Sequence, residues 1–150
     1  MVYIGIDPGV SGGIAILDDD GSVIECVNMP DTPMEIFQFL MGYKDGSVCV
    51  LEDVGQGMPG QSSSSTARFA RHNGHLEMAL LALGIRTIKA RPQKWEKTYS
   101  LGTSNKHEKS EWKRILKAKA QALFPQLGKK VTLKTCDALL IAEYCRRTNK

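Results

Sequence analysis

The sequence has no hydrophobic run that approaches the ~20 residues needed to cross a membrane, so we expect no membrane partner. It also has no basic leader, because the N-terminus enters an apolar, strand-like run at once, and this disfavours a secretory signal. No Cys-x-x-Cys pair is present, which disfavours a structural zinc site. The four scattered cysteines are typical of buried thiols in a reducing compartment.

Composition and length are those of an ordinary globular domain. Hydrophobic residues make up 42% of the 150 residues and charged residues 24%, which predicts one domain over residues 1–150 with a proper core. The formal net charge of +4 is only mildly basic. The position of the basic residues therefore decides whether the chain can bind a polyanion.

The N-terminal stretch Met1–Leu17 predicts two strands joined by a glycine-rich turn. The first strand is apolar on both faces and ends at Asp7, which indicates a buried central strand. A carboxylate in that position is costly unless it is paired or binds a metal. The alternative is that Asp7 only caps its own turn.

The rest of the chain alternates between strand and helix patterns, which indicates an α/β fold. We predict strands at 22–29, 47–51 and 85–88, and helices at 34–43, 65–83, 106–124 and 136–147. The strand–helix–strand order from the first strand to residues 47–51 is that of a parallel crossover. Asp7 and Glu52 then end two buried strands of one sheet, a frequent place for a site.

The predicted helix at 106–124 carries a basic stripe. The stripe consists of Lys106, Lys109, Lys113 and Lys117. Charge stripes are often only solvated faces. Here Trp95, Trp112 and Arg91 are close by, and a stripe with aromatic neighbours favours contact with a phosphate backbone.

A third carboxylate, Asp137, falls in the first turn of the last predicted helix. Asp7, Glu52 and Asp137 form a set without histidine or thiol partners, which suits Mg²⁺ or Mn²⁺. Two such ions, about 4 Å apart, can activate a water and stabilise the leaving oxygen in phosphodiester hydrolysis. The acids and the basic stripe together therefore predict a nuclease.

Five segments carry a resemblance to a known family. They are IGIDPGVSGGIAI, VLEDV, RPQKW, the lysine-rich helix and CDALLIAEY, in this order. Together they resemble the RuvC family of Holliday junction resolvases, in the RNase H-like superfamily, and most of all its bacteriophage-encoded members. The resemblance implies an RNase H-like α/β fold with a mixed five-stranded sheet, ordered 3-2-1-4-5 and flanked by helices.

The implied activity is that of a crossover junction endodeoxyribonuclease. A homodimer with two Mg²⁺ or Mn²⁺ ions in each active site would nick symmetric strands of four-way and other branched DNA, leaving 5′-phosphate ends. The implied setting is DNA recombination and repair or phage DNA processing, in the cytoplasm of a bacterial or phage-infected cell. The segment 65–83 matches the family's dimer helix.

The resemblance assigns the metal ligands to Asp7, Glu52 and Asp137. The family usually has an Asp or His one helical turn before the last acid, where this chain has Lys134. A charged lysine cannot bind a metal, so we predict that Lys134 is a catalytic residue that pairs with Asp137 or contacts the scissile phosphate. The alternative is that it points to solvent. The loop at 54–65 matches the segment that enters the junction centre, where Met58 and Pro59 would wedge against a base step. The predicted DNA-binding residues are Met58, Pro59, Arg68, Arg91, Lys94, Lys106, Lys109, Lys113 and Lys117.

Two rival functions share this fold prediction. One is a junction-binding protein that cuts poorly, because Lys134 departs from the family pattern. The other is an RNA-processing relative. An actin-like ATPase also begins with a strand, an Asp and a Gly-rich turn, but it needs two such domains and a longer chain.

Overall fold

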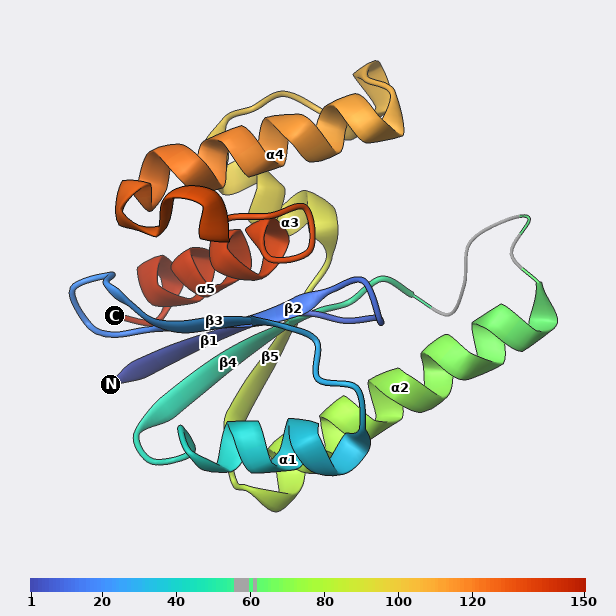
Figure 1. Ribbon diagram of the computed structural model, residues 1–150, viewed down its shortest axis with the longest axis vertical. Helices are drawn as coiled ribbons and strands as arrows, with labels where there is room; N and C mark the ends of the chain where they lie inside the picture. Colours follow the sequence, from blue (N-terminus) through green and yellow to red (C-terminus); the bar gives the residue numbers. More distant parts are fainter. Residues whose placement is uncertain (56–59, 61) are drawn as a thin grey trace.

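The computed structural model describes residues 1–55, 60 and 62–150. Its centre is a mixed five-stranded sheet in the order β3-β2-β1-β4-β5 (Figure 1), which confirms the predicted fold class. The strands are β1 (Val2–Asp7), β2 (Gly13–Leu17), β3 (Val23–Asn28), β4 (Ser47–Glu52) and β5 (Arg86–Ala90). The first three form an antiparallel meander, whereas β1, β4 and β5 run parallel.

Helices cover both faces of the sheet. They are α1 (Pro33–Met41), α2 (Ser63–Ala82), α3 (Pro92–Glu96), α4 (Lys109–Leu123) and α5 (Cys136–Thr148). Helices α1 and α2 cover one face, while α5 lies directly on the other and α4 packs on the outside of α5 (Figure 1). No helix within the described residues is both long and apolar enough to span a membrane.

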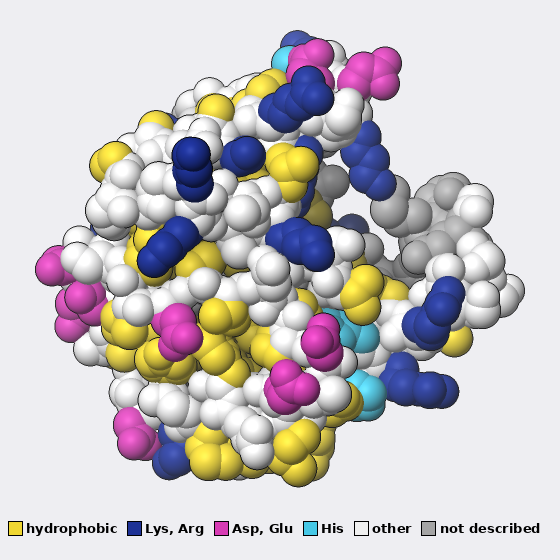
Figure 2. All heavy atoms as spheres, in the orientation of Figure 1, with side chains coloured by type: hydrophobic (Ala, Val, Ile, Leu, Met, Phe, Trp, Pro, Cys, Tyr) yellow, Lys and Arg dark blue, Asp and Glu magenta, His cyan; other side chains and the backbone are white. Residues whose placement is uncertain are grey.

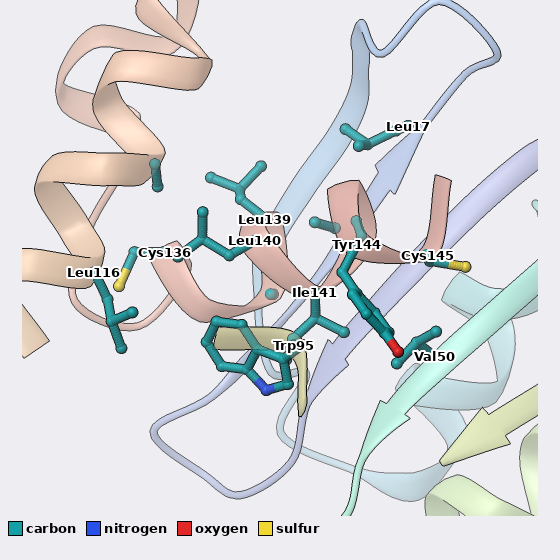
Figure 3. Packing of buried hydrophobic residues seen from close by; sticks show 14 of the residues in the cluster. Leu17, Val50, Trp95, Leu116, Cys136, Leu139, Leu140, Ile141, Tyr144 and Cys145 are labelled. Atoms are coloured by element: carbon teal, nitrogen blue, oxygen red, sulfur yellow. The ribbon is translucent and has the colours of Figure 1, made fainter. Parts of the chain in front are cut away.

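Alternation along the central strands sends their side chains into two cores. Ile4 and Ile6 of β1 belong to the core beneath α1 and α2. Tyr3 of β1 and Val50 of β4 belong to the core beneath α5, which Figure 3 shows from close by. Asp7 lies four residues after Tyr3, and Glu52 lies two residues after Val50, so the same alternation directs both acids toward α5.

Helix α5 approaches β1 very closely at Gly5. A Cβ atom added there would lie 2.2 Å from the backbone nitrogen of Ala142 and 2.4 Å from the carbonyl oxygen of Ala138. Only glycine leaves room for this contact between a strand and a helix. The contact brings the first turn of α5 over the end of β1.

The predicted helix at 106–124 is shorter in the structure. Helix α4 begins at Lys109, and a separate 3₁₀ turn spans Ser104–Lys106. His107 has an extended backbone with φ −131° and ψ 155°, and Glu108 is also extended, so the helix cannot run through them. The prediction that Lys106 belongs to one helical stripe with Lys109 is therefore wrong.

The two tryptophans are core residues rather than an exposed aromatic surface. Trp95 is 0% exposed and Trp112 is 7% exposed. Figure 3 shows Trp95 packed beside Leu140 and Ile141 of α5. The expectation that they support a basic stripe at the surface is therefore wrong, because the apolar rings gain more from burial than from solvent contact.

Candidate active site

The carboxyl ends of β1 and β4 place two acids side by side. The strands are parallel neighbours, with Ile6 paired to Leu51, so Asp7 and Glu52 follow at adjacent positions. Both point toward the face covered by α5, as the alternation in these strands requires. The proximity of Glu52 raises the pKa of Asp7.

Helix α5 adds the third acid. Asp137 is the second residue of the helix, and its charge raises the pKa of both Asp7 and Glu52. The glycine contact between α5 and β1 explains this proximity, because it holds the first turn of the helix over the strand end. The structure therefore brings together all three acids that the sequence singles out.

A tryptophan holds Glu52 in place. The indole Nε1 of Trp95 donates a hydrogen bond of 2.6 Å to Glu52 Oε2. Burial raises the pKa of Glu52 to about 7, although this hydrogen bond works in the opposite direction. Glu52 is thus a buried, oriented carboxylate whose charge needs a nearby cation.

Asp7 has the strongest demand for positive charge. Burial raises its pKa well above the ordinary value, and the charges of Asp137 and Glu52 raise it further. Like-charged carboxylates brought together in a low-dielectric site repel one another. Such a set is stable at neutral pH only with protons, an ammonium group or a metal ion between its members.

Lys113 of α4 supplies part of this charge. Its Nζ donates a hydrogen bond of 2.7 Å to Asp137 Oδ2 and lies 4.0 Å from Asp7 Oδ2. Burial opposes the charge on Lys113, but Asp137 and Asp7 raise its pKa above the usual value. The sequence analysis placed Lys113 in a DNA-binding stripe, whereas in the structure its ammonium group points toward the acid cluster.

Glu96, at the end of α3, is a fourth acid that the sequence analysis did not identify. It lines a cavity of about 800 Å³ together with Glu52, Lys113 and Asp137. Burial raises its pKa, and Asp137 raises it further. Its one signal in the sequence is its place directly after Trp95, whose indole binds Glu52.

The donor set suits a hard divalent cation, since carboxylate oxygens are the preferred ligands of Mg²⁺ and Mn²⁺. The unbalanced charge on Asp7 and Glu52 is a further observation in favour of such an ion. Within the described part of the chain, no three Asp, Glu, His or Cys side chains form a group that could hold a metal ion. In this structure the carboxylate of Asp137 is paired with Lys113.

The structure places Lys134 differently from the sequence prediction. Helix α5 begins at Cys136, so Lys134 lies in the turn before it and not on a helical face shared with Asp137. Lys134 is exposed, and its backbone nitrogen donates to Thr132 Oγ1. The predicted ion pair with Asp137 is wrong in this structure, where Lys113 makes that pair.

The predicted DNA-binding residues differ in exposure. Arg68, Arg91, Lys94, Lys106 and Lys109 are exposed, Lys113 and Lys117 are partly buried, and Met58 and Pro59 lie outside the described residues. Figure 2 shows Lys and Arg side chains over the α4 layer and also near the outer end of α2. Figure 1 shows the strands of the sheet between the layer of α4 and α5 and the layer of α1 and α2.

Neither a protein-family model nor a curated protein matches the sequence. Solved structures do match the fold. The RuvC structure from Thermus thermophilus has a TM-score of 0.68 at 13% identity, covering 99% of this chain and 96% of that one. T. thermophilus RuvC in complex with a Holliday junction substrate has a TM-score of 0.70 at 14% identity, with coverage of 99% and 97%.

A viral protein shares the same architecture. The fowlpox virus Holliday junction resolvase has a TM-score of 0.59 at 12% identity, covering 99% of this chain and 97% of that one. These likenesses extend over nearly the whole length of both partners in each comparison. The chain therefore has the RNase H-like fold of RuvC-type Holliday junction resolvases.

Proposed function

We propose that this protein is a divalent-metal-dependent endonuclease that resolves four-way and other branched DNA by paired nicking. The observation that carries the proposal is the convergence of Asp7, Glu52 and Asp137 at one edge of the sheet. The fold shared with RuvC-type resolvases, one of them solved with a Holliday junction, supports the choice of substrate. DNA recombination, repair or phage DNA processing is the proposed setting.

Asp7, Glu52 and Asp137 would hold Mg²⁺ or Mn²⁺, with Asp7 in the central position. Bound there, the metal supplies an activated water and stabilises the leaving oxygen of the phosphodiester. Trp95 keeps Glu52 in one orientation through its hydrogen bond. Because this orientation exists before substrate arrives, it lowers the cost of assembling the site.

The DNA backbone would contact exposed basic side chains around the acid cluster. Lys109 lines the same cavity as Glu52 and Asp137, so its ammonium group would contact a DNA phosphate close to the acids. Arg91 directly precedes α3, and Lys94 lies within it, two residues before Glu96 of the cavity. We propose the same phosphate-binding role for Lys134, which is exposed three residues before Asp137.

The direct test is cleavage of matched substrates with and without Mg²⁺. We expect the protein to nick a mobile four-way DNA junction, to act more slowly on a fork, and to leave a plain duplex of the same sequence uncut. A junction without added Mg²⁺ is the control. Tight junction binding without cleavage in Mg²⁺ or Mn²⁺ favours the binding protein, and preferential cleavage of a structured RNA favours the RNA-processing alternative.

Paired nicking requires two active sites, and we propose that α2 forms the contact between two copies of this chain. One face of α2 is apolar and exposed, with Met78 62% and Leu81 75% exposed. Ala70 and Gly74 lie on the same face at helical spacing and are also exposed. Small residues beside larger apolar ones let two helices approach closely, which suits a second copy of the same face.

Leu81→Glu tests this contact by placing a charge on the proposed interface. We expect the variant to be a monomer where the parent protein is a dimer, because burying an unpaired carboxylate is unfavourable. The measurement is light scattering after size exclusion. Ile24→Glu is the matched control, because Ile24 is 47% exposed on β3, away from α2. A monomeric parent, or a dimeric Leu81→Glu variant, contradicts the proposal.

A further inference from the structure

The ion pair between Lys113 and Asp137 is unusual in its position. The Lys113 ammonium group donates to Asp137 Oδ2 at 2.7 Å and lies 4.0 Å from Asp7 Oδ2. Both carboxylate side chains are 13% exposed, and that of Lys113 is 31% exposed. The pair therefore lies inside the proposed metal site rather than on the surface.

Within the described residues, no other cationic side chain forms an ion pair with Asp7 or Asp137. The remaining ion pairs lie elsewhere on the chain, and none of them reaches Asp7 or Asp137. Lys109, one helical turn before Lys113, is exposed and makes no ion pair with the described acids. Among the described residues, Lys113 alone brings a positive charge into contact with the buried acid cluster.

We propose that Lys113 is an internal counter-ion that occupies the cation position at Asp7 and Asp137 and has to be displaced when a divalent cation binds. The proposal rests on the metal site of the proposed function and adds a competitor from the chain itself. Lys113 and a metal ion would use the same oxygen, Asp137 Oδ2, so they cannot both bind it at full strength. The absence of a ready three-ligand group among the described residues agrees with this competition.

The flexible stem of lysine makes such an exchange physically reasonable. Its ammonium group is a compact point charge on four methylene groups, and it makes a single short contact to Asp137 rather than a two-point clamp. A displaced Lys113 would remain at the edge of the cavity that Glu52, Glu96 and Asp137 line. The metal-free protein would thus keep its buried acids neutralised, at the expense of metal affinity.

Lys113→Met tests the proposal, because methionine keeps the apolar stem without the charge. Mn²⁺ binding is measured without DNA, from the loss of the electron paramagnetic resonance signal of free Mn²⁺ during titration. We expect the variant to bind Mn²⁺ about 10- to 100-fold more tightly than the parent, as removing a unit charge about 4 Å from a carboxylate predicts in a partly exposed site. In the metal-free state the variant should unfold at a lower temperature, and added Mn²⁺ should reverse this loss.

Two further variants make the result specific. Lys113→Arg keeps the positive charge and should bind Mn²⁺ about as weakly as the parent. Lys109→Met removes a charge from the same helix without contacting the acids, and it should leave Mn²⁺ affinity within about twofold of the parent. It should also reduce the salt dependence of DNA binding by roughly one phosphate contact.

Equal Mn²⁺ affinity for the parent and Lys113→Met overturns the proposal, as does weaker binding by the variant or no binding by either protein. Equal gains in Lys113→Met and Lys109→Met also overturn it, because they would show a general effect of net charge. The titration contains no DNA, so a failure to cleave junctions leaves its outcome intact. Conversely, if the parent protein cleaves junctions with Mg²⁺ while Lys113→Met binds Mn²⁺ with unchanged affinity, the counter-ion role of Lys113 is refuted and the proposed function stays intact.

Discussion

Asp7→Asn, Glu52→Gln and Asp137→Asn are each expected to reduce junction cleavage by about 10³-fold or more, while junction binding stays close to that of the parent. Each substitution replaces a charged oxygen with a neutral amide of similar shape, so the cation at the reacting phosphate is held less well. The expected loss is at the upper end of what one electrostatic stabiliser contributes. Binding persists because phosphate contacts by basic residues supply most of the affinity for DNA.

The measurement is single-turnover nicking of a labelled four-way junction in Mg²⁺, alongside a binding assay in Ca²⁺ or without metal. Asp53→Asn is the matched control, because Asp53 directly follows Glu52 and its carboxylate instead accepts a hydrogen bond from the Gly55 nitrogen. We expect this variant to cleave like the parent. If a variant of one of the three acids cleaves at the parental rate, that residue is not part of the site.

Gly5→Ala is expected to destabilise the fold strongly, although it adds only one methyl group. The added Cβ would lie 2.2 Å and 2.4 Å from backbone atoms of Ala142 and Ala138, so α5 has to move away from β1. Backbone atoms cannot rotate aside as the end of a side chain does. The loss of unfolding free energy should therefore exceed the about 1–3 kcal/mol typical of overpacking.

Thermal and urea unfolding of the metal-free protein measure this effect. Gly42→Ala is the control, because Gly42 has a φ of −64° and its added Cβ would approach the Phe39 carbonyl oxygen at an acceptable 3.4 Å. Its effect should stay within about 0.5 kcal/mol. An equal midpoint for Gly5→Ala and the parent would show that α5 shifts at no cost. In that case the close contact would not be what positions Asp137.

Local patterns along the chain determined the elements and the faces of the central strands. The apolar runs before Asp7 and Glu52 predicted two buried strands, and both are present as β1 and β4. Their alternation carries both acids to one face, because successive side chains of a strand point to opposite sides. The sheet order came from the family resemblance, and the structure confirms it.

Helix boundaries were harder to predict, because several residues that could cap the helix N-terminus lie within a few positions of one another. Ser104 and Asn105 are good capping residues, yet α4 begins only at Lys109 after the extended backbone of His107 and Glu108. At α5, Thr135 directly precedes the helix, but its side chain makes no capping hydrogen bond. It donates instead to the carbonyl oxygen of Lys130.

The tertiary structure alone decided which partner each acid has. Trp95 reaches Glu52 across 43 residues of chain, and Lys113 reaches Asp137 across 24. No periodicity in the sequence links such distant positions. From the sequence alone, Lys113 was therefore as compatible with a surface stripe as with an ion pair to Asp137. The ammonium group of Lys113 points inward because the packing of α4 on α5 places it beside buried carboxylates. These carboxylates need a nearby positive charge only once the strands and helices have assembled and buried them.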